Sequence, residues 1–331
     1  MPEFSILDLA FVPEGSEPAE ALHRALNLAQ HAERWGYRRF WFAEHHNMVG
    51  RASAATAVAI GYVAGGTQKI RVGAGGIMLP NHAPLIIAEQ FGTLEALYPN
   101  RIDLGLGRAP GTDQLTVRAL RRSFASADTF PQDVLELQSF LGPLQPDQAV
   151  QAVPGTGSKV PLWILGSSLY GAELAAALGL PYAFASHFAP QALMQALEVY
   201  RRKFKPSAQL DRPYAMVSAN VIVADDDAEA RHLFTSVQQG FTNMLRNARG
   251  RLQPPIDEID TYWSPMEKAQ ASQMLSCAFV GAPDTVHTGL SDFIDQTQAD
   301  EIIVASAVYD HAARLKSYEL LSKIEMQIAG N

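Results

Sequence analysis

Short apolar segments alternate along this chain with longer segments whose apolar residues recur at helical spacing. A strand with one face in water alternates between apolar and polar residues, whereas a strand covered on both faces can be apolar throughout. The pattern therefore predicts an α/β fold in which helices cover both faces of a parallel sheet. The expected strands are residues 4–12, 39–43, 70–79, 102–107, 162–165, 182–186, 216–224 and 301–306.

Eight strand–helix units fit a (β/α)8 barrel of the TIM type, and a doubly wound sheet is the competing arrangement. A chain of 331 residues is long enough for one such barrel with an insertion. We therefore expect a single barrel domain over residues 1–331. Residues 249–278 contain three prolines and show no clear period, so we expect an irregular insertion there, just before the last strand.

The stretch from residue 70 to residue 111 forms one strand–helix–strand unit in this interpretation. Gly75 and Gly76 interrupt its first strand, which indicates either a bulge or a place where a ligand approaches the backbone closely. Its second strand ends in a loop that contains Gly107 and Arg108. Glycines and a cation at the carboxyl end of a buried strand favour a loop that holds an anionic ligand.

Functional side chains of a barrel lie at the carboxyl ends of its strands. Glu44, His45 and His46 end the second expected strand. We expect no metal there, because adjacent histidines on an extended segment point in opposite directions and the helical HExxH spacing is absent. A histidine that faces the barrel mouth as an acid or base is the favoured interpretation, and a solvent-facing loop histidine is the alternative.

Gly166, Ser167 and Ser168 follow the fifth expected strand and precede a helix. Hydroxyls and free amides at a helix N-terminus suit a phosphate group. Ordinary N-capping by a serine explains the same residues equally well when the motif stands alone. Arg108 favours the phosphate site, because a guanidinium matches the geometry of phosphate oxygens. A surface salt bridge is the alternative role for Arg108.

Composition excludes several classes of function. A net charge of −8 without a basic patch argues against a nucleic-acid partner. No apolar stretch approaches the roughly 20 residues of a membrane span. The lone Cys277 rules out an internal disulfide and, with the absence of a signal peptide, predicts a cytoplasmic protein. Residues 105–111 have the wrong spacing and a proline for a dinucleotide-binding GxGxxG loop.

The expected helix after the second strand is rich in small residues between Ala52 and Ala64. The neighbouring helix carries Glu89 and Thr93 among apolar residues. Small residues let helices approach closely, either in tight packing on the barrel or at the seam of a dimer. We favour a homodimer seam.

Four sequence segments resemble the bacterial luciferase-like flavin monooxygenases: FWFAEHHN, the stretch from RVGAGGIMLP to LGLGRAPG, PLWILGSS, and the tail FVGAPDTV with EIIVAS. The match runs in consistent order over nearly the whole chain. Within the family, this chain is similar to the single-chain members rather than to true luciferase. The resemblance implies a (β/α)8 barrel that binds FMN at the carboxyl ends of its strands. It also implies reduced FMN supplied by a separate flavin reductase, and activation of O2 at the flavin.

The resemblance also assigns roles to individual residues. His45 matches the active-site histidine, and Gly75–Gly76 matches a non-proline cis peptide beneath the flavin ring. Glu89 matches a carboxylate at the subunit interface of luciferase. The positions that match the phosphate contacts and their loop are Arg108, Ser167, Ser168, Tyr170 and Gly171.

Two positions depart from luciferase. Gly107 stands where luciferase has a reactive cysteine, and Ser167 stands where it has an acidic residue. Neither departure supports light emission. The expected function is therefore an FMN-dependent two-component monooxygenase, with a small organic substrate between the flavin and residues 249–278. An F420-dependent oxidoreductase on the same barrel and a flavin-binding protein without turnover are the alternatives.

Overall fold

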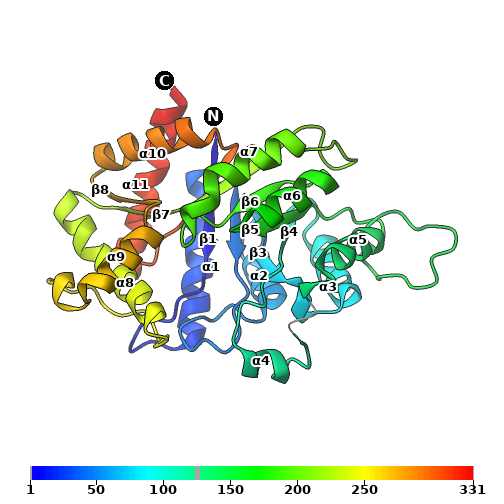
Figure 1. Ribbon diagram of the computed structural model, residues 1–331, viewed down its shortest axis with the longest axis horizontal. Coiled ribbons are helices and arrows are strands. Elements are labelled where there is room, and N and C mark those ends of the chain that lie inside the picture. Colours follow the sequence, from blue (N-terminus) through cyan, green and yellow to red (C-terminus); the bar gives the residue numbers. More distant parts are fainter. Residues whose placement is uncertain (1, 124–126, 331) are drawn as a thin grey trace.

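The computed structural model describes residues 2–123 and 127–330, with side chains described through residue 324. Parallel strands surround a common axis, and helices cover them from outside (Figure 1). The strands are β1 (Glu3–Asp8), β2 (Arg39–Phe42), β3 (Arg71–Met78), β4 (Ile102–Gly107), β5 (Leu162–Gly166), β6 (Tyr182–Phe184), β7 (Ala215–Val223), β8 (Ala278–Gly281) and β9 (Glu301–Ala305).

The sheet closes on itself. Strands β1 to β6 are neighbours in sequence order, β6 pairs with β7, β7 pairs with β9, and β9 pairs with β1. Every one of these pairings is parallel. The expected eight-stranded barrel is therefore confirmed, with β9 as its last strand. Strand β8 pairs with the far end of β7, outside the closed ring. It was not predicted, because its four residues are too short to show a period.

The helices lie mainly between consecutive strands. They are α1 (Pro18–Trp35), α2 (Thr56–Gly65), α3 (Pro84–Leu97), α4 (Gln114–Ala119), α5 (Phe130–Leu141), α6 (Leu169–Leu178), α7 (Leu193–Lys203), α8 (Asp227–Leu245), α9 (Pro265–Met274), α10 (Pro283–Thr297) and α11 (His311–Gly330), with short 3-10 turns η1 (Leu79–Asn81), η3 (Pro190–Ala192) and η4 (Ile259–Thr261). None in the described part of the chain is long and apolar enough to cross a membrane.

The insertion at 249–278 is more regular than expected. It contains η4 and α9, which lie beside α8 (Figure 1). Helix α9 begins with a capping box, in which the Ser264 side chain accepts from the Glu267 amide and the Glu267 carboxylate accepts from the Ser264 amide. The spacing of Ser264 and Glu267, with Pro265 at the first helical position, was a sequence signal for this helix. The prolines around it concealed that signal.

Two apolar layers stabilise the barrel. The larger one lies between the strands and the surrounding helices, and includes Phe40, Phe42 and Phe91, which are all fully buried. The smaller one contains the alternate residues Leu7, Trp41, Trp163, Met216 and Ile303. Because successive strand residues point to opposite faces, these alternate residues fill the inside of the barrel.

A buried ionic network crosses the amino-terminal end of the barrel. Arg39 Nη1 lies 2.7 Å from Asp103 Oδ2, and Arg39 Nε lies 3.0 Å from Glu301 Oε1. Arg71 Nη2 lies 2.6 Å from Asp103 Oδ1, and the Tyr214 hydroxyl donates to Glu301 over 2.9 Å. These five residues, called the floor network below, join β2, β3, β4 and β9 to the segment that leads into β7.

Pairing in the floor network outweighs the cost of burying Asp103, whereas burial keeps the pKa of Glu301 raised despite Arg39 and Tyr214. Burial alone would raise the pKa of Asp103, but the guanidinium groups of Arg39 and Arg71 lower it. The Arg39 guanidinium also lies 4.8 Å from the centroid of the Trp163 ring, so its face is covered by an aromatic surface. Removing one partner from such a buried group leaves an uncompensated charge.

We expect the Arg39→Leu variant to lose about 3–5 kcal/mol of unfolding free energy, because Asp103 and Glu301 would lose their shared cation. Urea denaturation followed by circular dichroism measures this change. Arg202→Leu is the matched control, since Arg202 forms an exposed pair with Glu198 whose loss should change stability by less than about 1 kcal/mol. Equal unfolding free energies for Arg39→Leu and wild type would contradict a stabilising floor network.

Candidate active site

The carboxyl ends of neighbouring parallel strands meet at one rim of the barrel, called the mouth below. His45 follows β2, the pair Gly75–Gly76 lies in β3, and Arg108 follows β4. Ser167 and Ser168 follow β5. Strands β2, β3, β4 and β5 are consecutive neighbours in the sheet. The fold therefore places the residues expected from the sequence on four adjacent strands, along one continuous half of the mouth.

The peptide bond between Gly75 and Gly76 is cis, as the family resemblance implied. The pairing of β3 with β4 shifts register between Gly75 and Ile77, so the bulge interpretation also holds. A Cβ atom at Gly75 would lie 2.9 Å from the Trp41 side chain, and one at Gly76 would lie 2.6 Å from the Gly105 carbonyl oxygen. Only glycine fits at either position without moving a neighbour.

The ends of β4 and β5 form what we call the β4–β5 corner, consisting of Arg108, Ser167, Ser168, Tyr170 and Gly171. The Arg108 guanidinium lies 4.3 Å from the centroid of the Tyr170 ring and forms no ion pair with any residue that the structure describes. Ser168 is the N-cap residue of α6, yet its side chain makes no capping hydrogen bond. The structure therefore supports neither the salt bridge nor the capping bond that were the alternative roles for these residues.

His45 is a partly buried residue whose Nδ1 atom has no hydrogen-bond partner among the described residues. Burial lowers its pKa to about 4, with a smaller contribution in the same direction from the Arg51 guanidinium. The imidazole is therefore neutral at physiological pH. A neutral imidazole with a free ring nitrogen can accept a proton from a bound molecule or donate a hydrogen bond to it.

His187 lies at a strand carboxyl end, the kind of position that predicts a site residue in a barrel, although no specific role was assigned to it from the sequence. It follows β6, and burial, together with the proximity of His45, lowers its pKa to about 4. Its Nδ1 atom also lacks a partner in the described chain, while Asn220 Nδ2 holds its backbone carbonyl at 2.5 Å. The segment YAFAS-H has a polar residue after an apolar strand, and this was the sequence signal for His187.

Glu44 is the buried centre of a separate cluster. Its carboxylate lies 2.7 Å from His46 Nε2 and 3.0 Å from His82 Nε2, and it accepts from Met78 N and Asn81 Nδ2 at 3.0 and 3.1 Å. Burial alone would raise the pKa of Glu44, but hydrogen bonds from His46 and His82 lower it to about 2. The cluster thus ties the segment after β2 to the segment after β3 and fixes the backbone on both sides of His45.

The ligand atoms of Glu44, His46 and His82 all lie within 4.8 Å of one another, which is a composition that could hold a divalent metal. The sequence argument against a metal considered only the adjacent pair His45 and His46. It missed His82, which is distant in sequence and enters the cluster from the turn after η1. His46 points to Glu44 and His45 does not, in agreement with the alternation expected of an extended segment.

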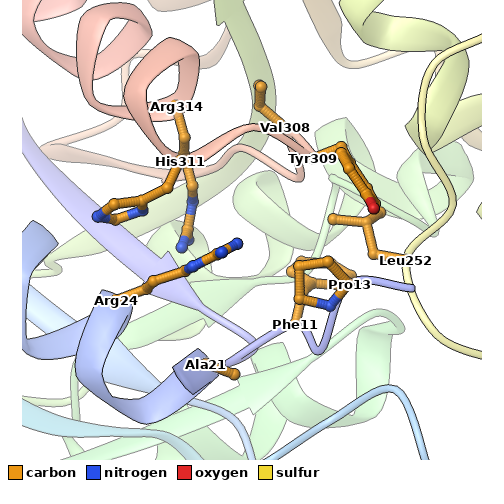
Figure 2. A pocket seen from close by; sticks show the side chains of 9 residues that line it. All are labelled: Phe11, Pro13, Ala21, Arg24, Leu252, Val308, Tyr309, His311 and Arg314. Carbon is orange, nitrogen blue, oxygen red and sulfur yellow. The ribbon is translucent and has the colours of Figure 1, made fainter. Parts of the chain in front are cut away.

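A small pocket lies between α1, the segments that follow β1 and β9, and Leu252 of the insertion (Figure 2). Arg24, His311 and Arg314 lie on one side of it, and Phe11, Pro13 and Tyr309 lie on the other (Figure 2). None of the residues expected from the sequence to bind a ligand lines this pocket. Arg314 is already paired with Asp8 at 3.0 Å, so we do not assign this pocket to the active site.

Comparisons with known proteins agree with the fold and identify the family. The sequence model described as luciferase-like monooxygenase matches residues 1–300. A luciferase-like monooxygenase of Escherichia coli (strain K12) is 55% identical, over 99% of this chain and 98% of that protein. The uncharacterized protein YvbT of Bacillus subtilis (strain 168) is 53% identical, over 97% of this chain and 96% of its own. The chain belongs to the luciferase-like monooxygenase family, and it is an enzyme of that class.

More specific names come from partial or structural matches. N-acetyl-S-alkylcysteine monooxygenase of Bacillus subtilis (strain 168) is 41% identical over 56% of this chain and 57% of that protein. The crystal structure of apo-MsnO8 has a TM-score of 0.91 at 35% identity, covering 98% of this chain and 99% of that one. Two more distant structures share the fold alone. The first is the oxygenating constituent of 3,6-diketocamphane monooxygenase from Pseudomonas putida, in complex with FMN, with a TM-score of 0.73 at 18% identity over 97% of both chains. The second is an F420-dependent secondary alcohol dehydrogenase, with a TM-score of 0.71 at 14% identity over 96% of this chain and 98% of that one.

Proposed function

We propose that this protein is an FMN-dependent monooxygenase that receives reduced FMN from a separate reductase and uses O2 on a small organic substrate. The observation that carries the proposal is the order in which polar and glycine positions follow one another around the mouth. A cation and a free hydroxyl at the β4–β5 corner, a glycine pair on β3 and a neutral histidine after β2 follow one another on adjacent strands. This order matches a phosphate, a flat ring and a reacting face.

The residues present fit FMN. Arg108 and Ser168 would hold the phosphate, because each has hydrogen-bonding capacity that no described residue uses. Ser167, Tyr170 and Gly171 would complete the loop around it. Gly75 and Gly76 would present backbone to the ring. Reduced FMN, when bound, supplies the electrons that activate O2.

The protein's own contribution is to position groups and to exclude water. His45 would accept or return a proton at the reacting face, since its neutral imidazole has an unused ring nitrogen. The start of the 249–278 insertion packs on the segment that follows β1, at the mouth end of the barrel. Leu252 N donates to the Val12 carbonyl over 2.9 Å, and Glu14 N donates to the Leu252 carbonyl over 2.8 Å. Such packing would keep loose protons away from the reaction.

The F420-dependent alternative rests on shared fold with F420 enzymes. The longer acidic tail of F420 would need more cations than Arg108 provides at the β4–β5 corner. Named relatives that are monooxygenases, including the partly matching N-acetyl-S-alkylcysteine monooxygenase, favour oxygenation of a small molecule. Titration with FMN and F420 in parallel separates these possibilities.

The lone Cys277 supports our placing of the enzyme in the reducing cytoplasm.

We expect the Arg108→Ala variant to bind FMN roughly 10- to 150-fold more weakly, because a charge-assisted hydrogen bond contributes about 1.5–3 kcal/mol. Riboflavin is the matched ligand control, since it has the same ring without the phosphate. Its affinity should be the same for Arg108→Ala and wild type. Fluorescence titration measures both affinities. Equal losses for FMN and riboflavin, or no loss for FMN, would mean that the phosphate binds elsewhere.

The His45→Asn variant should keep its FMN affinity but oxidise bound reduced FMN faster when mixed with O2, with H2O2 as the product. Stopped-flow absorbance and a peroxide assay measure this. Because the pKa of His45 is about 4, the wild-type rate should be flat from about pH 6 to pH 8, where an ordinary histidine would titrate. His287→Asn, on the outer helix α10, should behave as wild type. Identical traces for His45→Asn and wild type would remove His45 from the mechanism.

We also propose a homodimer through α2 and α3, which contact each other. Large apolar side chains are exposed there, including Val58 at 74% and Leu97 at 63%. Glu89 lies on α3, partly buried within the single chain. Exposed apolar side chains on two helices that contact each other favour an interface.

The Val58→Glu variant should shift the protein from a dimer toward a monomer of 36.0 kDa in light scattering at micromolar concentration. A charge placed in an apolar interface loses its hydration without gaining a partner. Met266→Glu is the control, because Met266 is 72% exposed on α9, a helix that packs against α8 and not against α2 or α3. A wild-type protein that is already monomeric would contradict the proposal, and so would a Val58→Glu dimer as stable as wild type.

A further inference from the structure

Glu44 differs from the other buried carboxylates in the groups that neutralise it. The others in the described chain, each paired with a buried arginine, are Asp8, Asp103 and Glu301. Glu44 forms no ion pair with an arginine or a lysine that the structure describes, and its partners are the imidazoles of His46 and His82. A histidine carries a full positive charge only when it is protonated. Glu44 therefore lacks the permanent cation that the other buried carboxylates have.

The two imidazoles converge on this carboxylate from different segments of the chain. His46 Nε2 lies 2.7 Å from Glu44 Oε1, and His82 Nε2 lies 3.0 Å from Glu44 Oε2. The three ligand atoms all lie within 4.8 Å of one another. Bonds of about 2.0–2.2 Å in a tetrahedral zinc site place neighbouring ligand atoms about 3.3 Å apart. Side-chain shifts of roughly half an ångström would therefore admit an ion between them.

Further donors orient the carboxylate. Met78 N donates to Glu44 Oε2 over 3.0 Å, and Asn81 Nδ2 donates to Glu44 Oε1 over 3.1 Å. Asn81 Nδ2 also lies 3.0 Å from the Pro110 carbonyl oxygen, which fixes the amide in turn. Hydrogen bonds to a ligating carboxylate are a regular feature of metal sites, because they hold the ligand in the geometry that the ion requires.

The backbone of both histidines is anchored independently of their rings. The Thr112 hydroxyl donates to the His46 carbonyl over 3.1 Å. His82 N donates to the Leu79 carbonyl over 2.9 Å, which closes the turn η1. The rings can therefore shift to admit an ion while the segments that position them stay in place. This is the arrangement expected of a preorganised site.

The site is accessible to solvent from the histidine side. The Glu44 side chain is 1% exposed, whereas the side chains of His46 and His82 are 19% and 25% exposed. An ion can therefore reach the ring nitrogens from water, and a water molecule can take a fourth position on it. The carboxylate lies beneath them, away from competing cations in solution.

We propose that Glu44, His46 and His82 bind one Zn2+ ion per chain, with water as the fourth ligand. Imidazole nitrogens with a carboxylate oxygen suit Zn2+, whereas Mg2+ and Ca2+ prefer oxygen ligands alone. The ion would supply the positive charge that no arginine supplies to Glu44. It would also join the segment after β2 to the turn after β3. The site consists of this chain's own residues and does not rest on the proposed flavin chemistry.

Metal titration of the purified protein tests the proposal. The protein is first dialysed against EDTA and then titrated with Zn2+ in competition with a chromophoric chelator. We expect one Zn2+ per chain with a Kd of about 1 μM or tighter. Mg2+ is the matched control ion and should not bind at the same concentrations. No Zn2+ binding by wild type, or Mg2+ binding as tight as Zn2+ binding, would overturn the proposal.

Variants assign the ion to these ligands. His46→Asn and His82→Asn should each weaken Zn2+ binding by more than roughly 100-fold, and Asn81→Ala by roughly 10- to 100-fold, as is typical of an outer partner. His45→Asn is the matched control, because this neighbouring histidine is not a ligand and its variant should keep the wild-type Zn2+ affinity. Circular dichroism verifies that each variant is folded. Folded His46→Asn and His82→Asn variants that bind Zn2+ as tightly as wild type would overturn the proposal.

Discussion

The rest of the structure depends on the buried pairing of Arg39 with Asp103 and Glu301. These charges come from β2, β4 and β9, so their pairing joins strands across the inside of the barrel at its amino-terminal end. Each carboxylate also accepts from further donors, including the Trp41 indole at 3.2 Å and the Tyr214 hydroxyl at 2.9 Å. Burying charge is tolerated here because the geometry satisfies almost every polar atom.

The opposite end of the same barrel has the reverse character. His45, Arg51 and His187 keep polar atoms that no described residue satisfies. Other contacts hold these residues in place. Glu44 fixes the segment around His45, the Phe11 ring stacks on Arg51, and Asn220 Nδ2 donates to the His187 carbonyl. A satisfied floor and an unsatisfied mouth are what a barrel enzyme requires, because ligands bind where the protein leaves hydrogen-bonding capacity unused.

Local pattern predicted much of this arrangement, because buried parallel strands and their carboxyl-end residues leave strong signals. The barrel, the positions of His45 and Arg108, and the cis bond at Gly75–Gly76 were all expected from sequence or resemblance. Contacts between residues that are distant in the sequence were not expected. His82 reaches Glu44 from another strand's loop, and the unpartnered Nε atom of Arg51 can be recognised only in three dimensions. Short β8 and the proline-flanked α9 lacked enough period to be recognised.

The central claim is that the mouth holds FMN with its phosphate at the β4–β5 corner and its ring against Gly75–Gly76. A crystal structure of the protein with FMN tests it most directly. The account predicts phosphate oxygens within hydrogen-bonding distance of Arg108 and Ser168, the ring on the glycine pair, and His45 facing the ring. A phosphate bound at Arg51, or a ring that does not touch Gly75–Gly76, would contradict it.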